Sequence, residues 1–310
     1  MPQIIVLGAA AGGGFPQWNC NCTNCQLAWQ GSDRVKPRTQ SSLAVSADSK
    51  HWVILNASHD IRQQIAATPE LQPRRGTRDS PISSIVLTNA DVDHVAGLLT
   101  LRERQGFRLY ATGRVQSVLQ SNPILNVLNP DFVKREALDL DQPTVISDAN
   151  GNSIGIEITL FAVPGKVALY LEDESSGDNF GSVDEDTVGV AISCDNSTKT
   201  IFYLPGCAAM PEWLQQKLRG SDLVFMDGTT WINDEMAQTG AGEKTSQRMG
   251  HISMSGNDGS LAKFAGLDVK TQVFVHINNT NPVLRLDSEE NRQATAAGWL
   301  IAEDGMQFEL

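Results

Sequence analysis

The chain has few cysteines and lacks any long apolar run. Its 310 residues contain 5 Cys, three of which lie within six positions. A secreted domain held together by disulfides carries an even, dispersed set, so this class is excluded. A membrane-spanning helix needs roughly 20 consecutive apolar residues, and no stretch comes near this length. The first apolar run also lacks the preceding Lys or Arg of a signal peptide. We therefore expect a cytoplasmic protein without a membrane span.

Positive charge is also scarce. The chain has 24 Lys and Arg against 36 Asp and Glu, which gives a formal net charge of -12 at pH 7. An acidic surface repels phosphate backbones, so we expect no nucleic-acid partner. The content of 41% hydrophobic residues, 26 Gly and 13 Pro is ordinary for a globular protein. This composition excludes collagen, coiled coil and wholesale disorder.

Strand-like and helix-like segments alternate along the chain. Apolar runs of continuous or alternating type predict strands, and amphipathic segments predict helices. We predict strands at 3–7, 43–46, 51–56, 82–88, 107–111, 156–163, 189–193, 200–204, 223–226 and 272–276. We predict helices at 61–68, 94–104, 114–120, 211–219 and 259–266. Hairpins followed by strand–helix units favour an α/β (α+β) protein, with two mixed sheets face to face and helices outside.

No repeat or linker divides the sequence, so we expect one domain over 1–310. The segment 172–186 carries seven acidic residues among Ser and Gly. It lacks the ligand pattern of a calcium-binding loop, which ends in a bidentate Glu. We therefore interpret it as a solvated surface loop or a mobile flap.

A cluster of cysteines lies near the start of the chain. Cys20, Cys22 and Cys25 have the spacing C-x-C-x-x-C, and thiolates this close in sequence suit one soft tetrahedral ion, usually zinc. A closed structural site needs a fourth ligand, for which the loop residue His251 is our candidate. A strained local disulfide and a redox pair are the alternatives.

A second cluster follows the apolar strand 82–88. Asp91, Asp93 and His94 lie within four residues, at a strand end where open α/β sheets bind ligands. A cap at the helix start and ordinary surface charges would explain them equally well. His276 favours a site, because it ends another apolar strand. Two imidazoles with one or two carboxylates would suit non-haem Fe²⁺ at least as well as Zn²⁺.

These residues, in this order, resemble the metallo-β-lactamase fold family, whose domain is an αββα four-layer sandwich. The opening strand and Gly-rich turn correspond to 5–16, the H-x-H-x-D-H signature to 89–94, and the last metal histidine to His276. A closer resemblance is to the branch that acts in pyrroloquinoline quinone (PQQ) biosynthesis. It rests on LGAAAGGGFPQWNCNC, TNADVDH, VPGK, YLPGC, FMDGTTW, MGHISM and HINNTNP. A related phosphodiesterase branch completes the same cysteine cluster with a histidine, which implies His251 as the fourth ligand here.

The sequence departs from the family at several metal positions. Asn89 and Asp91 replace the first two signature histidines, Lys166 stands near the third-motif histidine, and Cys207 stands near the bridging aspartate. A dinuclear hydrolase needs those ligands to hold two metals about 3.5–4 Å apart. One open metal position remains, formed by Asp91, Asp93, His94 and His276.

The resemblance implies an iron- and O₂-dependent hydroxylase of the tyrosine ring in a cross-linked Glu–Tyr intermediate. The alternatives are a carrier that moves PQQ or its precursor to the periplasm, and a divergent zinc hydrolase. Candidate substrate contacts are Lys166, Asn89, Cys207 and Asp227. Other proteins of the pathway are expected partners, and a homodimer is compatible with the sequence.

Overall fold

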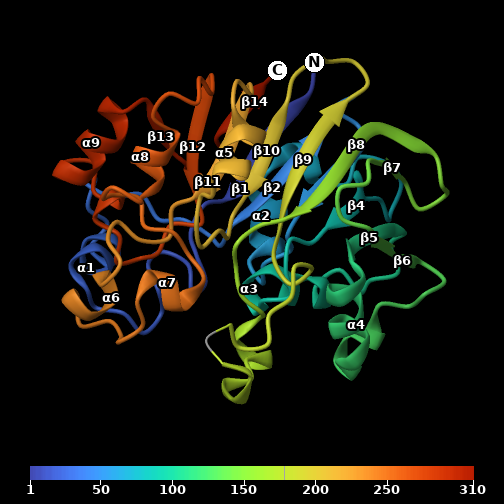
Figure 1. Cartoon of the computed structure of the whole chain (residues 1–310). Helices are drawn as coiled ribbons and strands as arrows, with labels where there is room; N and C mark the ends of the chain where they lie inside the picture. The colour runs from blue at the N-terminus through green and yellow to red at the C-terminus, as the bar shows by residue number, and fades with distance from the viewer. Residues whose placement is uncertain (178) are drawn as a thin grey trace.

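The computed structural model describes residues 1–177 and 179–310, which form two seven-stranded sheets packed face to face (Figure 1). In spatial order, the first sheet consists of β14 (Gln307–Glu309), β1 (Gln3–Gly8), β2 (Ser42–Ser46), β3 (Trp52–Leu55), β4 (Ile82–Val86), β5 (Phe107–Thr112) and β6 (Val133–Leu138). The second consists of β13 (Trp299–Ile301), β12 (Thr271–Val275), β11 (Leu223–Asp227), β10 (Ile201–Leu204), β9 (Val188–Cys194), β8 (Ser153–Ala162) and β7 (Thr144–Ser147).

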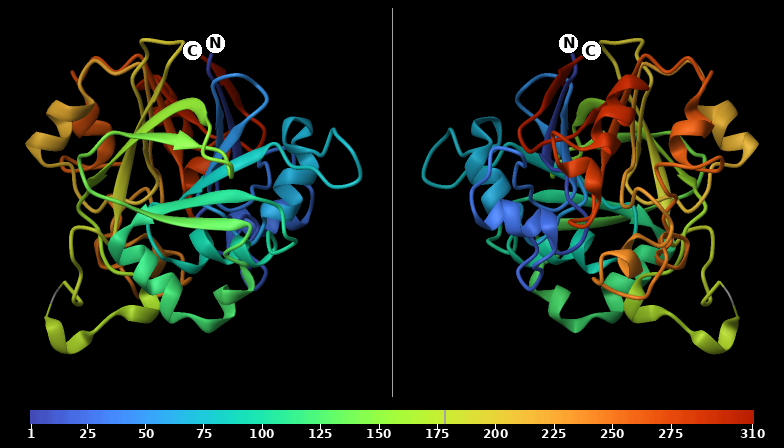
Figure 2. Two further views of the ribbon diagram at one scale, coloured as in Figure 1. Left: turned by 90° about the vertical axis from the view of Figure 1, so that its right-hand side faces the viewer. Right: turned by 90° about the vertical axis from the view of Figure 1, so that its left-hand side faces the viewer.

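Each sheet contains both parallel and antiparallel pairs. In the first, the pairs from β3 to β6 are parallel and the others antiparallel. In the second, the pairs from β10 to β13 are parallel. The helices are α1 (Thr23–Trp29), α2 (Ile61–Ala67), α3 (Val92–Val95), α4 (Gly113–Ser121), α5 (Glu212–Leu218), α6 (Glu235–Gln238), α7 (Ser246–Met249), α8 (Ser260–Phe264) and α9 (Glu289–Ala296). Helices lie outside the sheets (Figure 2), so the predicted αββα sandwich is confirmed.

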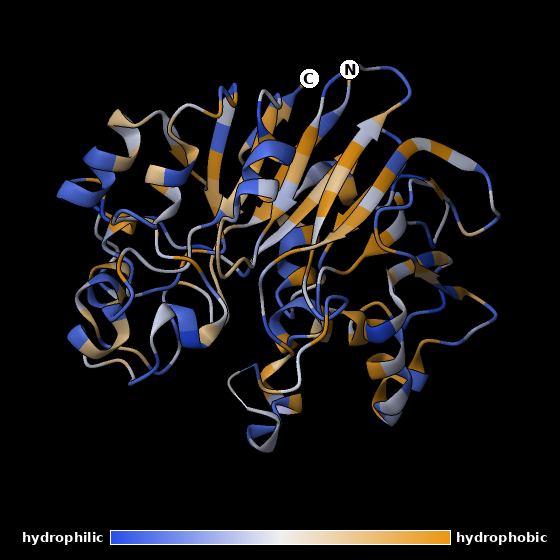
Figure 3. Ribbon diagram, in the orientation of Figure 1, coloured by the Kyte–Doolittle hydropathy of each residue, from blue (hydrophilic) through white to orange (hydrophobic). Residues whose placement is uncertain are grey.

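Many strand residues are apolar, as the hydropathy colouring shows (Figure 3), and they pack on both faces of the sheets. One cluster joins the inner faces of the two sheets, and two others lie between a sheet and its helices. Phe225 in β11 is fully buried and contacts Tyr203 and Phe308 edge to face, with ring centroids 6.5 and 5.3 Å apart. Because Phe308 belongs to β14, this contact crosses from one sheet to the other. The shared core supports the interpretation as one domain, which stays a prediction.

The helix predicted at 94–104 is wrong in its extent. Helix α3 ends at Val95 and continues as one short 3₁₀ segment, Ala96–Leu99. The backbone of Ala57 explains the change, because its N–H donates to the His94 carbonyl and its carbonyl accepts from the Gly97 N–H, both at 2.8 Å. None of the helices in the part of the chain that the structure describes is long and apolar enough to cross a membrane.

The acidic segment 172–186 forms part of a longer excursion between β8 and β9. Asp178 lies outside the described residues, and the rest of the segment projects from the same end of the sandwich as α3 and α7 (Figures 1 and 2). The two chain termini lie together at the opposite end (Figure 1).

The aromatic contact between the sheets should dominate local stability. Phe225→Ala should lower the free energy of unfolding by about 3–5 kcal/mol, because it leaves a cavity between the sheets. Trp18→Ala is a matched aromatic control: its side chain is 83% exposed, so we expect a change within about 0.5 kcal/mol. Urea titrations of both variants followed by circular dichroism measure the difference. Equal midpoints would contradict the proposed role of this contact.

Candidate metal centre

The candidate site forms where strands of both sheets end. Asp93 and His94 lie in α3, shortly after β4 of the first sheet. Asp227 is the last residue of β11, and His276 directly follows β12. Strands β11 and β12 are parallel neighbours, so their carboxyl ends meet at one edge. The fold therefore brings together residues that are up to 183 positions apart.

Among the described residues, two groups at this edge have ligand atoms within 4.8 Å of one another: Asp93, His94 and His276, and Asp227, His251 and His276. His276 belongs to both. Its Nε2 lies 3.2 Å from Asp93 Oδ2, and its ring stacks on that of His251 with centroids 5.1 Å apart. One imidazole thus faces a carboxylate on one side and a second imidazole on the other.

Hydrogen bonds fix the orientation of His276. Its backbone adopts φ of +54°, a left-handed conformation that is uncommon outside glycine and frequent at functional sites. The Thr229 hydroxyl lies 2.7 Å from Asp227 Oδ1 and 2.9 Å from His276 Nδ1. Because the hydroxyl has one proton, donation to Asp227 leaves its oxygen to accept from His276 Nδ1–H. In the neutral ring, Nε2 then carries the lone pair that a metal needs. Although burial opposes it, the hydrogen bond to Asp93 raises the pKa of His276, so a metal at Nε2 would replace a proton that this nitrogen otherwise donates to Asp93.

Asp227 holds the surrounding loops in place. Its Oδ1 accepts from the backbone N–H and the hydroxyl of Thr229, and its Oδ2 accepts from the Cys207 N–H at 2.9 Å and lies 2.6 Å from His251 Nδ1. Four donors satisfy both oxygens of this fully buried carboxylate. Asp227 is therefore suited to orient His251, whose Nε2 remains available, and less suited to bind a metal itself.

The electrostatics of the first group suit a cation. Burial opposes ionisation of Asp93, but the charge of His94 and the hydrogen bond from His276 outweigh it and hold the pKa of the carboxyl well below its usual range. Burial lowers the pKa of His94 to about 4, against the opposing effect of Asp93. At neutral pH the site therefore presents a carboxylate beside a neutral imidazole, which are the forms that bind metals.

His94 provides a direct indication that a ligand belongs here. Its Nε2 is buried and has no hydrogen-bond partner among the described residues. A buried nitrogen without a partner is costly, and a metal ion would satisfy it. Two imidazoles and one carboxylate form the facial triad of non-haem Fe²⁺ sites, and the same donors also accept Zn²⁺. Asp93, His94 and His276 therefore fit a metal.

Asp91 lies outside the group formed by Asp93, His94 and His276, although the sequence analysis expected all four residues at one metal position. It precedes the first residue of α3 without a side-chain capping hydrogen bond, and its Oδ1 accepts from the Leu169 N–H at 3.1 Å. Burial, followed by the charge of Asp93, raises the pKa of the Asp91 carboxyl. The carboxylate is thus directed toward the segment that follows β8.

The predicted substrate contacts have different environments. Asn89 Oδ1 accepts from the Asp91 N–H, and Lys166 Nζ pairs with Glu172 at 2.5 Å. The Cys207 thiol donates to the Ala209 carbonyl, and burial raises its pKa to about 12. Sequence reasoning treated Asp227 as a substrate contact, whereas its carboxylate is occupied by protein donors.

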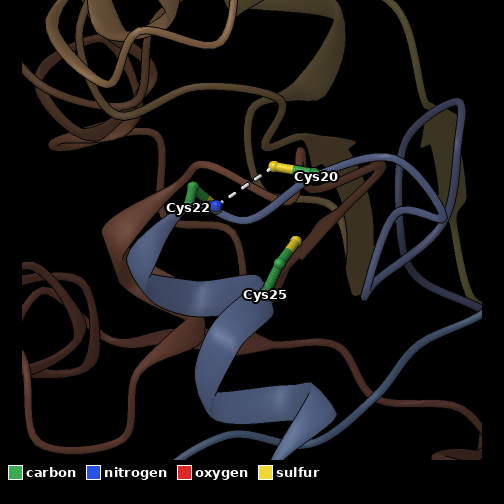
Figure 4. Close-up of side chains that lie close together, drawn as sticks. All are labelled: Cys20, Cys22 and Cys25. Atoms are coloured by element: carbon green, nitrogen blue, oxygen red, sulfur yellow. Dashed lines mark hydrogen bonds between the residues drawn. The ribbon is translucent and has the colours of Figure 1, made fainter.

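The three clustered cysteines converge at the start of α1 (Figure 4), with their sulfur atoms within 4.8 Å of one another. Zn–S bonds of about 2.3 Å in a tetrahedron place sulfurs about 3.8 Å apart, so this spacing fits zinc. A hydrogen bond from Cys25 lowers the pKa of Cys22 to about 5, which favours a thiolate. Asn279 covers the cluster, with its Nδ2 3.1 Å from Cys20 Sγ and 3.4 Å from Cys25 Sγ.

The structure places His251 at the open site, whereas the sequence analysis expected it beside the cysteine cluster. Its Nδ1 lies 2.6 Å from Asp227, and its ring stacks on His276, so it belongs to the open site. The residue beside the cysteines is Asn279, which the sequence analysis did not single out. Its position three residues after His276 was the signal in the sequence that could have identified it. The segment that contains both residues runs from the open site to the cysteine cluster.

The comparisons with known proteins agree with this architecture. The sequence profile of the beta-lactamase superfamily domain matches residues 51–277. Coenzyme PQQ synthesis protein B of Xanthomonas campestris pv. campestris (strain B100) is 50% identical over 308 residues, which cover 99% of this chain and 100% of the relative. The chain belongs to the coenzyme PQQ synthesis protein B family. The same-named protein of Methylorubrum extorquens is 49% identical, with the same coverage.

Solved structures give the same result. The zinc-bound PqqB of Methylobacterium extorquens superposes with a TM-score of 0.94 at 49% identity and covers 99% of this chain and 100% of its own. A diphosphatase of the PhnP family has a TM-score of 0.70 at 20% identity, with 100% and 98% coverage. The second likeness shows the shared fold alone.

The cysteine cluster should hold a structural zinc. Cys22→Ser should release about one zinc per chain and lower the unfolding temperature, because metal binding at such a site contributes to folding. Elemental analysis and thermal denaturation measure both effects, with Cys194→Ser, a buried cysteine outside the cluster, as the control. A Cys22→Ser variant that retains its zinc and its unfolding temperature would show that the cluster is not a metal site.

His251 should affect only the open site. His251→Ala should leave the zinc of the cysteine cluster and most of the stability intact, since its Nδ1 and ring contact Asp227 and His276. Zinc release to a chromogenic chelator, compared with Cys22→Ser, is the measurement. Loss of the tightly held zinc in His251→Ala would restore the original assignment.

Proposed function

We propose that the protein acts in PQQ biosynthesis as a metal-dependent oxygenase that hydroxylates the tyrosine ring of the Glu–Tyr-derived intermediate. Family membership supports the pathway. The observation that carries the reaction type is the convergence of Asp93, His94 and His276, with ligand atoms within 4.8 Å of one another. The buried Nε2 of His94 in this group has no hydrogen-bond partner in the part of the chain that the structure describes. An Fe²⁺ ion held by these three residues would supply O₂ activation, since such a triad leaves positions open.

The protein residues around this triad each have a role. Asp93 provides the fixed negative charge, and Thr229 holds His276 in the tautomer with Nε2 free. His251 is the most accessible of the three imidazoles, with 17% of its side chain exposed. Its Nε2 can take a proton from the substrate phenol, and Asp227 at Nδ1 stabilises the resulting charged ring. His251 would thus be the acid–base residue, and Asp227 its positioning residue.

A dinuclear zinc hydrolase is disfavoured by Asp227. Its two oxygens already receive four hydrogen bonds from protein groups, so a second metal beside His251 would have to displace them. A carrier role remains the second candidate, because a metal site that holds a ligand without turnover would use the same residues.

The decisive experiment starts from the full chain with zinc kept in the cysteine cluster. The open site is loaded anaerobically with Fe²⁺, the cross-linked Glu–Tyr compound is added, and O₂ is admitted. We expect substrate-dependent O₂ uptake and a product heavier by one oxygen atom, detected by mass spectrometry. Tight binding without O₂ uptake would support the carrier, and ester or phosphodiester hydrolysis with zinc would support the hydrolase.

Single substitutions at the triad test the assignment. His94→Ala, His276→Ala and Asp93→Asn should each weaken Fe²⁺ binding by more than about 100-fold, because ligands matter more than the outer partners that cost 10–100-fold. His51→Ala is the control, since this histidine pairs with Asp48 in an exposed hairpin. Isothermal titration with Fe²⁺ under nitrogen measures the affinities. Unchanged Fe²⁺ affinity in both His94→Ala and His276→Ala would contradict the assignment of these residues as metal ligands.

A further inference from the structure

Beside the metal centre, two cations share one carboxylate. Glu172 Oε1 lies 2.5 Å from Lys166 Nζ and 3.0 Å from Arg248 Nη1, and Glu172 Oε2 lies 2.7 Å from Arg248 Nη2. The Arg248 contact is therefore bidentate, the geometry in which a guanidinium recognises a carboxylate. The side chains of Lys166 and Glu172 are only 16% and 8% exposed. Hydrogen bonds from Arg248, with Lys166 assisting, lower the pKa of Glu172 to about 2.

This cluster lies at the edge of the open site. Arg248 belongs to α7, three residues before His251, and the Lys166 side chain packs on Gly250, where an added Cβ would be 2.9 Å from Lys166 Cγ. On the other side, Leu169 donates its N–H to Asp91, two residues before Asp93. Lys166 and Arg248 thus lie beside the residues that precede His251, and the charge of Lys166 also acts on Asp91, two residues before Asp93.

Glu172 is held in place mainly by polar contacts. The short 3₁₀ segment Leu169–Leu171 before it has no buried residue, and the Tyr170 hydroxyl donates to the Ala90 carbonyl at 2.9 Å. Leu171 packs against the core between the first sheet and its helices, so a rotation of the Glu172 side chain alone, with the backbone in place, would expose little apolar surface. Arg248 has separate support, because its guanidinium lies 3.8 Å from the centroid of the Phe180 ring.

We propose that Lys166 and Arg248 form a binding site for a carboxylate of the substrate, and that Glu172 occupies this site until the substrate displaces it. The inference rests on the proposed function, whose substrate and pathway product both carry several carboxylates. Lys166 and Arg248 carry one charge more than the carboxylate they share, with Asp91 and Glu174 as the further carboxylates that act on them, in a protein with a net charge of -12. An incoming carboxylate takes over the bidentate contact with Arg248, and Glu172 moves to solvent with its charge hydrated.

The test measures binding, so it does not require turnover. PQQ, a tricarboxylate, is titrated into the full chain by calorimetry, and its uncharged trimethyl ester serves as the matched ligand. Arg248→Gln should weaken PQQ binding by about tenfold or more, because it removes a charge-assisted bidentate contact. Glu172→Gln should tighten PQQ binding, because the competing carboxylate becomes neutral. The ester should bind more weakly than PQQ and respond little to either change.

Arg114→Gln is the control variant. It removes the ion pair with Asp186 at 3.0 Å, which lies in the same excursion of the chain, and it should leave PQQ binding unchanged. Loss of structure in Arg248→Gln cannot imitate the result, because Glu172→Gln is predicted to change affinity in the opposite direction. Absent PQQ binding to the wild type, unchanged affinity in Arg248→Gln, or no gain in Glu172→Gln would each overturn the proposal.

The same titrations separate this inference from the proposed reaction. If Arg248 and Glu172 respond as predicted but the Fe²⁺-loaded chain transfers no oxygen, the carboxylate site stands and the oxygenase fails. If oxygen transfer occurs and neither Arg248→Gln nor Glu172→Gln changes the affinity for PQQ, the proposed reaction is supported and the carboxylate site is contradicted.

Discussion

The buried carboxylate of Asp227 is the interaction on which the rest of the site depends. It ends β11 and receives hydrogen bonds from the Cys207 backbone and from Thr229, and its second oxygen lies 2.6 Å from His251. Through the Thr229 hydroxyl it also fixes His276. A single charge therefore orders loops that follow several strands. Such a group is stable only while all its donors are present, because an unpaired buried charge is very costly.

The two clusters of metal-binding residues are physically linked by one short segment. His276 closes the open site, and Asn279 lies against the sulfurs of Cys20 and Cys25. A zinc in the cysteine cluster would hold this segment and so indirectly position His276. A structural zinc would then have a functional consequence, because it would support an imidazole in a left-handed backbone conformation that the chain would otherwise avoid.

Sequence reasoning identified the buried strands and the strand-end residues, but it missed the edges of both sheets. In the first sheet, β6 reads VKREAL and has exposed positions, and β14 spans three residues. In the second sheet, β7 and β13 span four and three residues. None of these edge strands shows the apolar pattern of a central strand. Short, polar edge strands prevent the sheet from pairing with other chains. Because they are short or polar, the hydrophobic pattern of the sequence does not reveal them. Buried strands such as β12, by contrast, marked the position of His276.

The prediction of the site failed where contacts depend on loops. His251 and Asp227 are 24 positions apart, and no periodicity relates a loop histidine to the end of a strand. The resemblance to a phosphodiesterase branch then led to the prediction that His251 lies beside the cysteines. In this structure, Asn279 lies there instead. Asp91 was similarly grouped by its spacing with Asp93, although its carboxylate turns to Leu169. Short sequence distance therefore places residues near a site, and only the tertiary hydrogen bonds determine which of them face it.

The residues that differ from the H-x-H-x-D-H metal signature of the family agree with a different chemistry at the metal position that this chain retains. Asn89 and Asp91 make contacts that hold the loop between β4 and α3, so the first two signature positions now support structure. What remains for a metal is Asp93, His94 and His276, with His251 alongside. A dinuclear site uses its ligands to bridge two ions and activate water between them. A single ion with one carboxylate and two imidazoles instead keeps positions open for two other molecules, a geometry suited to joining O₂ to a bound substrate.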